Sequence, residues 1–370
     1  MKTYDIAIVG AGILGLAHAL AAQRLGRSVL VIDRDDCANG ASVRNFGFVT
    51  VTGQQVGPCW NHAVRSREIW AEIAPQAGIP VLHQGLIVTA RRPQTEAVLA
   101  AFAETEMGRD CRLLTPAQAL DKVPALRADG LCAALWSPHE LRVESRQAIP
   151  ALTAWLAAQG VDFLWNTTVQ AVETPRIVTS RGQIEARQVI VCPGDTLTGL
   201  FADRIAAHGV TRCKLHMLRL RPRQAVTLGA AVMSDLSLVR YLGYAELPQA
   251  QDLLAVLRAE QDAHLNNGVH LIAVQSGDGS LVVGDSHHYS ATPDPFQPAA
   301  VDALITDEFR QVLDLDCDIT ERWIGTYASA PGGWYFTDAP DADTRLVVVT
   351  AGCGASTAFS IGEETLKTLL

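Results

Sequence analysis

Short apolar runs that end near a glycine recur at the start, in the middle and at the end of the chain. They occupy residues 4–9, 188–192 and 345–350, and each is followed within two residues by a glycine. Apolar runs of this length, bounded by turn residues, are typical of buried strands. The pattern predicts that three distant segments contribute strands to one sheet.

Other segments carry the periods of helices and of further strands. Apolar positions at helical spacing predict helices over residues 63–77, 95–107, 146–160, 249–264 and 356–370. Shorter runs predict strands at residues 85–89, 161–165, 169–173, 177–179, 214–220 and 281–283. We expect 214–220 and 281–283 in a second, more antiparallel sheet. Because there is no repeat of fixed period and no long polar linker, the two regions are expected to interleave.

The first 33 residues carry a specific nucleotide-binding pattern. Gly10, Gly12 and Gly15 follow the first apolar run in the spacing Gly-x-Gly-x-x-Gly, and the next run, 28–33, ends in Asp33. The first glycine permits a sharp turn, the second a close approach to a pyrophosphate, and the third close packing of helix on strand. The helix start attracts phosphate, and the terminal acid can bind a ribose. We therefore expect a dinucleotide site.

Composition limits the possible partners. The 370 residues are 48% hydrophobic and 19% charged, which is ordinary for a soluble protein of about two domains. A net charge of −9 makes nucleic acid an unexpected partner. Residues 6–22 are apolar enough to suggest a membrane span, but three glycines and a histidine favour strand plus helix. With no secretion signal expected either, we predict a cytoplasmic protein without a membrane partner.

Cysteine and histidine spacing points away from a metal centre. The eight cysteines form no Cys-x-x-Cys pair and are expected to be small buried residues in a reducing compartment. No spacing among the ten histidines indicates a ligand set, so no metal is expected.

The recurrence of glycine-ended strands also bears on which dinucleotide is bound. A nicotinamide dehydrogenase usually keeps its nucleotide fold in one continuous segment. Strands that return in the last twenty residues suit a flavin, whose reactive ring lies far from its adenine. FAD is therefore favoured over NAD.

A family resemblance agrees with this preference. The chain resembles the D-amino-acid oxidase family, which includes glycine oxidase and sarcosine oxidase, at residues 1–33, 41–45, 65–70, 191–194 and 352–356. The resemblance covers essentially the whole chain and implies an α/β fold. In it, a doubly wound FAD-binding domain interleaves with an α+β substrate domain on a mixed, largely antiparallel sheet. The implied FAD-binding domain comprises residues 1–80, 145–212 and 325–370, and the substrate domain comprises 81–144 and 213–324.

The same resemblance implies the cofactor contacts. FAD-binding positions carried over in this way are Gly10, Gly12, Ile13, Leu14, Gly15, Asp33, Arg34, Ser42, Arg44, Asn45, Val169, Gly194, Gly325, Gly352, Gly354, Ala355, Ser356 and Thr357. The cysteine that ties the flavin covalently in the sarcosine-oxidase branch would fall at Gly325. Non-covalent FAD is therefore expected.

A narrower resemblance concerns the substrate. Residues 42–47, 140–147, 211–215 and 284–287 resemble a branch of the family associated with phosphonate catabolism, which implies 2-aminoethylphosphonate or its N-methyl derivative. The carboxylate anchors of glycine oxidase and sarcosine oxidase would fall at Tyr327 and Ser356, so both are missing. The lysine linked to oxygen activation would fall near Val282, so the acceptor is dioxygen or another oxidant.

Several residues are candidates for substrate chemistry. Expected substrate-binding residues are Arg44, Asn45, Lys214, His216 and Tyr241. Lys214 and His216 alternate along one strand and can present two basic groups on one face. His287 is the candidate proton acceptor, and Tyr327 is expected to line the flavin's substrate side. The helix start at Ser356 and Thr357 can stabilise negative charge on the flavin.

The expected reaction converts a small amine to an imine, which water hydrolyses to an aldehyde, phosphonoacetaldehyde for the preferred substrate, and free amine. Two alternatives remain open. One is a glycine- or sarcosine-type amino-acid oxidase, and the other is a flavoprotein subunit that only passes electrons to a partner.

Overall fold

The computed structural model describes residues 3–370 and contains two mixed sheets, here named A and B. Sheet A consists of β1 (Thr3–Val9), β2 (Val29–Ile32), β7 (Asp162–Leu164), β8 (Val169–Glu173), β9 (Arg176–Thr179), β10 (Gly182–Val191), β17 (Tyr335–Asp341) and β18 (Thr344–Val349). Sheet B consists of β3 (Phe48–Val49), β4 (Val81–Ala90), β5 (Arg112–Leu114), β6 (Ala133–Val143), β11 (Thr211–Pro222), β12 (Ala231–Met233), β13 (Ile272–Gln275), β14 (Leu281–Gly284), β15 (His288–Ser290) and β16 (Cys317–Ser329).

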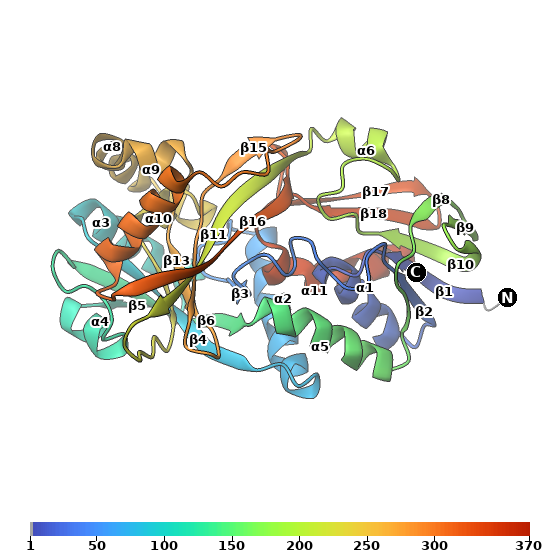
Figure 1. Ribbon diagram of the computed structural model, residues 1–370, viewed down its shortest axis with the longest axis horizontal. Coiled ribbons are helices and arrows are strands. Elements are labelled where there is room, and N and C mark those ends of the chain that lie inside the picture. Colours follow the sequence, from blue (N-terminus) through green and yellow to red (C-terminus); the bar gives the residue numbers. More distant parts are fainter. Residues whose placement is uncertain (1–2) are drawn as a thin grey trace.

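Helices surround both sheets. The α-helices are α1 (Ile13–Arg24), α2 (Pro58–Gln76), α3 (Pro93–Ala103), α4 (Pro116–Lys122), α5 (Ser145–Ala158), α6 (Ala202–Ala207), α7 (Leu242–Ala245), α8 (Ala250–Glu260), α9 (Asp262–Asn266), α10 (Ala299–Val312) and α11 (Gly354–Leu369). In Figure 1, sheet A lies on the right, α3, α4 and α8–α10 lie on the left, and the long strands β11 and β16 run between the two regions.

The three glycine-ended runs are neighbours in sheet A. The strand order is β17-β18-β10-β1-β2-β7, and every pair from β18 to β7 is parallel. Parallel strands place their carboxyl ends on one edge of a sheet, so the glycine turns after β1, β10 and β18 meet there. The expected sharing of one sheet by three distant segments is confirmed.

Helix α1 forms the centre of the first region. All ten residues from 13 to 22 are buried, because α1 contacts β1, β2 and β10 and is also covered by α5 and α11. A Cβ on Gly362 of α11 would lie 2.9 Å from the backbone of Ala17, so glycine allows the two helices to touch. This all-round burial explains why residues 6–22 look like a membrane span. Between residues 3 and 370, no helix has the length and apolarity needed to cross a bilayer.

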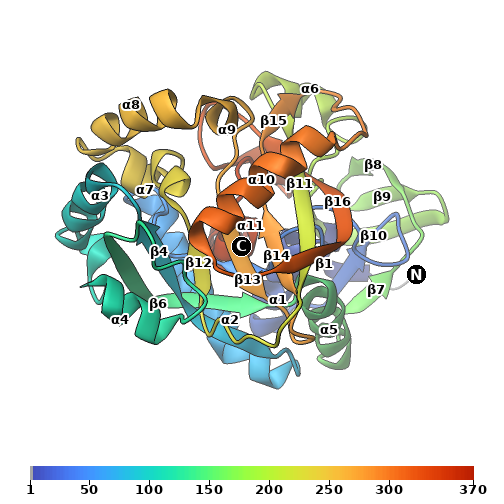
Figure 2. The same ribbon diagram turned by 60° about the vertical axis from the view of Figure 1, so that its left-hand side comes forward.

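Sheet B is mostly antiparallel, as expected for the second region. Its one parallel pair joins β4 and β12, and its other pairs are antiparallel. Helix α10 contacts β11 and β14 and passes in front of them in Figure 2. One side of β11 is therefore covered by this helix.

Some sequence expectations differ from the structure. The predicted helix over 249–264 is divided into α8 and α9, and the long strands β6 and β16 were not predicted, because neither has strict alternation of apolar and polar residues. Strand β3 and the last five residues of β16 belong to sheet B, although both fall in segments expected in the FAD-binding domain. All eight cysteines are free, and Cys37 and Cys132 are exposed rather than buried.

Candidate active site

The first glycine turn brings backbone very close to backbone. Gly10 has a φ of +106°, and a Cβ there would lie 2.4 Å from the carbonyl oxygen of Cys192. A Cβ on Gly15 would lie 1.8 Å from the carbonyl oxygen of Gly10, and one on Gly12 would lie 3.0 Å from Ser42 Oγ. Backbone atoms cannot move aside for a side chain, so the first and third positions require glycine.

The start of α1 offers donors to an anion. The Ile13 N–H donates to Ser42 Oγ at 2.9 Å. Among the described residues, no acceptor outside the helix receives the Leu14 and Gly15 N–H groups. Unpaired N–H groups at the positive end of a helix dipole are typical of phosphate sites. The turn therefore fits the pyrophosphate of FAD.

Asp33 is held at the same turn. Its Oδ2 accepts the Ala11 N–H at 2.6 Å and its Oδ1 accepts the Asp35 N–H at 3.0 Å. Each carboxylate oxygen keeps acceptor capacity for a ribose hydroxyl. Val169 opens β8 and packs in the same buried cluster as Ile32, next to Asp33. Val169 and Asp33, both expected to bind FAD, thus belong to the same part of sheet A.

The turn after β10 lies beside the turn after β2. Gly194 has a φ of +61°, and no atom lies within 4 Å of the position of a Cβ there. Arg34 Nη1 donates to Thr196 Oγ1 at 3.0 Å. Arg34 thereby links the turn after β2 to the turn after β10, and both turns carry expected FAD-binding residues.

The loop at 41–45 contributes backbone more than side-chain groups. Asn45 Nδ2 donates to the Ala41 carbonyl at 2.6 Å, and its Oδ1 accepts the Gly47 N–H at 2.6 Å. The Asn45 amide is thus used to shape the loop. The Arg44 carbonyl accepts Trp323 Nε1 at 3.0 Å and lies 3.0 Å from a Cβ placed on Gly325, while no hydrogen bond or ion pair of the Arg44 guanidinium occurs within residues 3–370.

The C-terminal turn meets both the first turn and sheet B. A Cβ on Gly354 would lie 3.9 Å from Ile13, and one on Gly352 would lie 3.7 Å from the Tyr327 hydroxyl. The starts of α1 and α11 therefore converge near β16. Side-chain and backbone contacts hold the first turn of α11: Ser356 Oγ accepts Thr50 N–H, Thr357 Oγ1 donates to the Cys353 carbonyl, and the Ala355 carbonyl accepts Trp70 Nε1.

Aromatic side chains and one cation lie on the sheet B side of this turn. Arg240 Nη2 donates to the Tyr289 hydroxyl at 3.0 Å. Burial alone would lower the pKa of Arg240, but Tyr327 and Tyr289 raise it above its usual value. Burial raises the pKa of Tyr241 and Tyr327, so both phenols keep their protons. The sequence prediction named Tyr241 but missed Arg240 beside it.

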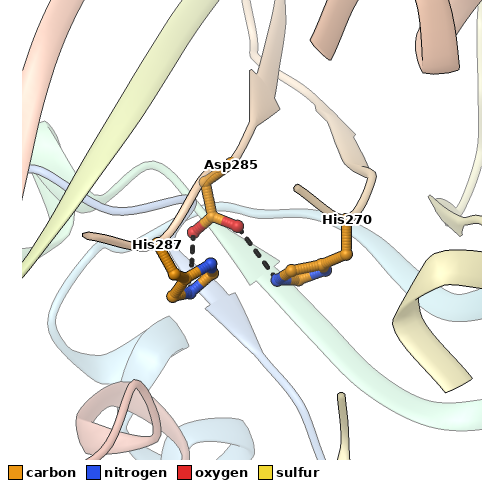
Figure 3. A group of neighbouring side chains, drawn as sticks. All are labelled: His270, Asp285 and His287. Carbon is orange, nitrogen blue, oxygen red and sulfur yellow. Dashed lines mark ion pairs between the residues drawn. The ribbon is translucent and has the colours of Figure 1, made fainter. Parts of the chain in front are cut away.

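Two histidines flank a buried aspartate in the same region. Asp285 Oδ1 lies 2.9 Å from His270 Nε2, and Asp285 Oδ2 lies 3.8 Å from His287 Nε2 (Figure 3). The His287 ring is 6.4 Å from that of Tyr327, and the His270 ring is 5.6 Å from that of Tyr241, in edge-to-face contacts. The cluster therefore borders the tyrosines next to the C-terminal turn.

The protonation of this cluster follows from its burial. Burial lowers the pKa of His287 to about 3, although Asp285 opposes this effect. Burial alone would raise the pKa of Asp285, but the two imidazoles and Arg240 outweigh it and hold that pKa below its usual value. At neutral pH the site thus contains a neutral His287 beside an ionised carboxylate.

Histidine and aspartate are also common metal ligands, so His270, Asp285 and His287 form a candidate metal site. One donor atom from each of His270, Asp285 and His287 lies within 4.8 Å of the others. Histidine spacing in the sequence did not reveal this group, because a loop and two strands separate His270 from Asp285. A polar residue inside the apolar run 269–274 was the available signal.

Lys214 and His216 do not join this region. Strand β11 pairs Cys213 with Tyr327, whereas Lys214 pairs with Thr326. Directly opposed residues share a face and neighbours alternate, so Lys214 and His216 point away from Tyr327. This geometry gives no support to their expected role at the substrate's anion, which stays a prediction.

Both residues also have acidic partners on the α10 side. Lys214 Nζ lies 2.8 Å from Asp294 Oδ2, and His216 Nδ1 lies 3.6 Å from Asp302 Oδ1. Their side chains are 5% and 1% exposed. Lys214 is therefore ion-paired within the fold, and His216 is buried near a carboxylate.

Comparison with known proteins agrees with this arrangement. The family model described as "DAO: FAD dependent oxidoreductase" matches residues 5–367. The chain is 25% identical over 354 residues to the bifunctional protein ThiO/ThiG of Nostoc sp., covering 89% of this chain and 47% of that protein. It is 24% identical over 202 residues to an N-methyl-L-tryptophan oxidase of Yersinia pestis, covering 52% of this chain and 53% of that one. The chain thus spans about half the length of these curated relatives.

Solved structures share the fold. Glycine oxidase from Bacillus cereus superposes with a TM-score of 0.77 at 16% identity, covering 99% of this chain and 94% of that structure. The expected two-region α/β architecture is confirmed, and the glycine turns and unpaired helix donors fit the expected FAD. From its family match over nearly its whole length, the chain belongs to the DAO family of FAD-dependent oxidoreductases.

Proposed function

We propose that this protein oxidises the C–N bond of a small amine that carries an anionic group, with 2-aminoethylphosphonate or its N-methyl derivative as substrate. The observation that carries this proposal is the placement of Arg240 beside Tyr327, Tyr289 and Asp285. Arginine supplies a charge for the anion in the region where the carboxylate anchors of other family members are absent.

The guanidinium of Arg240 retains unused donors. It has five N–H groups, and the hydrogen bond to Tyr289 uses one of them. A planar fork of N–H donors suits the several oxygens of a phosphonate. Arg44 adds a second guanidinium without a side-chain partner among the described residues. A phosphonate is therefore favoured over a singly charged carboxylate.

The proposed reaction begins with the ammonium form of the amine. The ammonium R–CH2–NH2R′⁺ loses a proton to His287 Nε2 and becomes a neutral amine. FAD, when bound, supplies the acceptor for the hydride, the C–H electron pair with its proton. Loss of that hydride leaves the iminium R–CH=NHR′⁺, which water converts to the aldehyde R–CHO and the ammonium R′NH3⁺.

The residues of the chain bind and orient the reactants. Arg240 and Arg44 fix the anion, the tyrosines exclude water, and His287 faces the amine with a lone pair. The position of Gly325 offers no side chain for a covalent flavin bond, so we propose that FAD is bound non-covalently. Acid precipitation should then release the flavin into the supernatant.

An anaerobic reduction screen tests the proposal. Purified protein is mixed without oxygen with 2-aminoethylphosphonate, its N-methyl derivative, glycine or sarcosine, and bleaching of the flavin absorbance is followed. We expect bleaching by the aminophosphonates. Bleaching only by the amino acids would reject the phosphonate substrate and favour the amino-acid oxidase, a reaction named for N-methyl-L-tryptophan oxidase and glycine oxidase among the similar proteins.

The same experiment separates the remaining alternatives. A flavoprotein that no amine reduces would be an electron-transferring subunit instead. Readmission of air then distinguishes the acceptors, because an oxidase regains its absorbance and forms hydrogen peroxide, whereas a dehydrogenase needs an added acceptor.

A further inference from the structure

Asp285 and His287 face each other with no proton between the two facing atoms. A carbonyl oxygen only accepts hydrogen bonds, so the 2.9 Å contact of His287 Nδ1 with the Gly268 carbonyl places the ring proton on Nδ1. His287 Nε2 is then a free acceptor that faces another acceptor, Asp285 Oδ2, at 3.8 Å. Two buried acceptors side by side are unfavourable unless a hydrogen-bond donor lies between them. A shared proton or an N–H group of a ligand can supply that donor.

His270 holds the other end of the carboxylate. Its Nε2 lies 2.9 Å from Asp285 Oδ1, and its Nδ1 lies 3.3 Å from Ser237 Oγ, which also contacts the Leu271 carbonyl at 3.2 Å. Asp285 itself is 4% exposed and His270 is 3% exposed. Buried partners on both ring nitrogens fix the His270 ring and, through it, the carboxylate.

We propose that Asp285 and His270 are positioning residues that let the site bind the ammonium form of its substrate and transfer the ammonium proton to His287. This inference rests on the proposed amine oxidation and deepens it. Asp285 offsets the positive charge that arrives with the ammonium and then the charge of the imidazolium that replaces it. The proton moves from substrate nitrogen to His287 Nε2, and no electrons move in this step.

Other charged and titratable groups around Asp285 are compatible with this role. Besides the two histidines, a network of charged and titratable groups interacts electrostatically with Asp285 and His287, either directly or through a shared neighbour. Its members are Arg240, Tyr241, Tyr327, Tyr289, Cys213 and Cys353. Arg240 is the cation among them, and its charge acts on both Asp285 and His287. Repulsion from the guanidinium favours a proton relay over a metal centre.

The pH dependence of flavin reduction tests this inference. The second-order rate constant is measured anaerobically from pH 7 to pH 9 with whichever amine reduces the wild-type protein. We expect the wild-type constant to vary less than about threefold, because the site accepts the ammonium. In Asp285→Asn only the free amine should react, so the constant should rise about tenfold per pH unit below an amine pKa of about 10.

Asp302→Asn is the matched control. Asp302 is also a buried aspartate beside a histidine, His216, but it lies on the opposite face of β11. The rate constant of Asp302→Asn should vary with pH as little as that of the wild-type protein. The inference is wrong if Asp285→Asn lowers the rate in parallel at every pH, or if the wild-type protein itself shows the tenfold slope.

Two further measurements keep the result interpretable. FAD content and thermal unfolding establish that each variant is folded. If Asp285→Asn loses its flavin, His287→Gln replaces it, because glutamine can still donate to Gly268, and the same tenfold slope is expected. Zinc binding measured by calorimetry, present in the wild-type protein and lost in Asp285→Asn, would overturn the relay in favour of a metal site. If no amine reduces the flavin at all, the proposed function fails rather than this inference.

Discussion

Lys214 and Tyr327 lie on paired strands but point to opposite faces of sheet B. Cys213 stands directly across from Tyr327, and Lys214 follows it on the face covered by α10, where it pairs with Asp294. The tyrosine faces the C-terminal turn near Gly352. Lys214 is therefore ion-paired on the α10 side, and Arg240 is the cation that we propose for the substrate's anion.

Replacement of Arg240 should weaken binding of an anionic amine. Arg240→Met removes charge-assisted hydrogen bonds, each of which contributes about 1.5–3 kcal/mol, so the apparent dissociation constant should rise about 10- to 100-fold. Anaerobic titration of the flavin absorbance measures it. Lys214→Met provides the comparison, since loss of its pair with the exposed Asp294 should leave substrate affinity unchanged. Equal effects of both variants would remove Arg240 from the anion site.

Arg44 is expected to contribute to the same anion. Arg44→Ala should weaken substrate binding, yet cost less than about 0.5 kcal/mol of unfolding free energy, because its guanidinium has no hydrogen-bond or ion-pair partner in the described part of the chain. Substrate titration and urea denaturation measure the two quantities. An unchanged apparent affinity would exclude Arg44 from substrate binding.

Gly15 should be indispensable for the binding of FAD. In Gly15→Ala the new Cβ would lie 1.8 Å from the Gly10 carbonyl oxygen, so the first turn and α1 must separate. We expect protein without flavin, destabilised by about 3 kcal/mol or more. The ratio of flavin to protein absorbance and the melting temperature report both effects. Gly332→Ala, where no atom lies within 4 Å of the new Cβ, should retain the flavin.

Buried histidines should make the fold sensitive to acid. Burial lowers the pKa of His18 to about 4 and those of His83 and His287 to about 3, from 6.5. Below pH 6.5 the unfolded chain binds protons that the folded chain excludes, so stability is lost as the pH falls from 6.5 towards 4. Each histidine should cost about 2 kcal/mol at pH 5.

Urea midpoints at pH 7 and pH 5 measure this loss. His83→Gln should reduce the difference between the two midpoints, because its neutral amide can still accept the Gln275 N–H that His83 Nε2 accepts at 3.3 Å. His139→Gln, at a partly exposed ring, should leave the difference as it is in the wild-type protein. A midpoint that does not change with pH would contradict the proposed burial of neutral imidazoles.

The sequence by itself determined the nucleotide-binding end. The spacing of Gly10, Gly12 and Gly15 and the acid at Asp33 act within one strand, turn and helix, so local sterics specify their geometry. Apolar runs that end in glycine also revealed the parallel neighbours β1, β10 and β18, because a strand buried on both faces has few polar positions. The family resemblance added FAD and the two-region architecture.

Only the tertiary structure decided which polar side chains meet on the substrate side. His270 and Asp285 lie fifteen residues apart on either side of the β13–β14 hairpin and become neighbours through strand register. The alternation along β11 places Lys214 and His216 on one face, but the register with β16 decided that this face is the one away from Tyr327, and α10 packs against β11. Period-two alternation says that two faces differ, and only the packing of neighbouring elements says which of them faces the site.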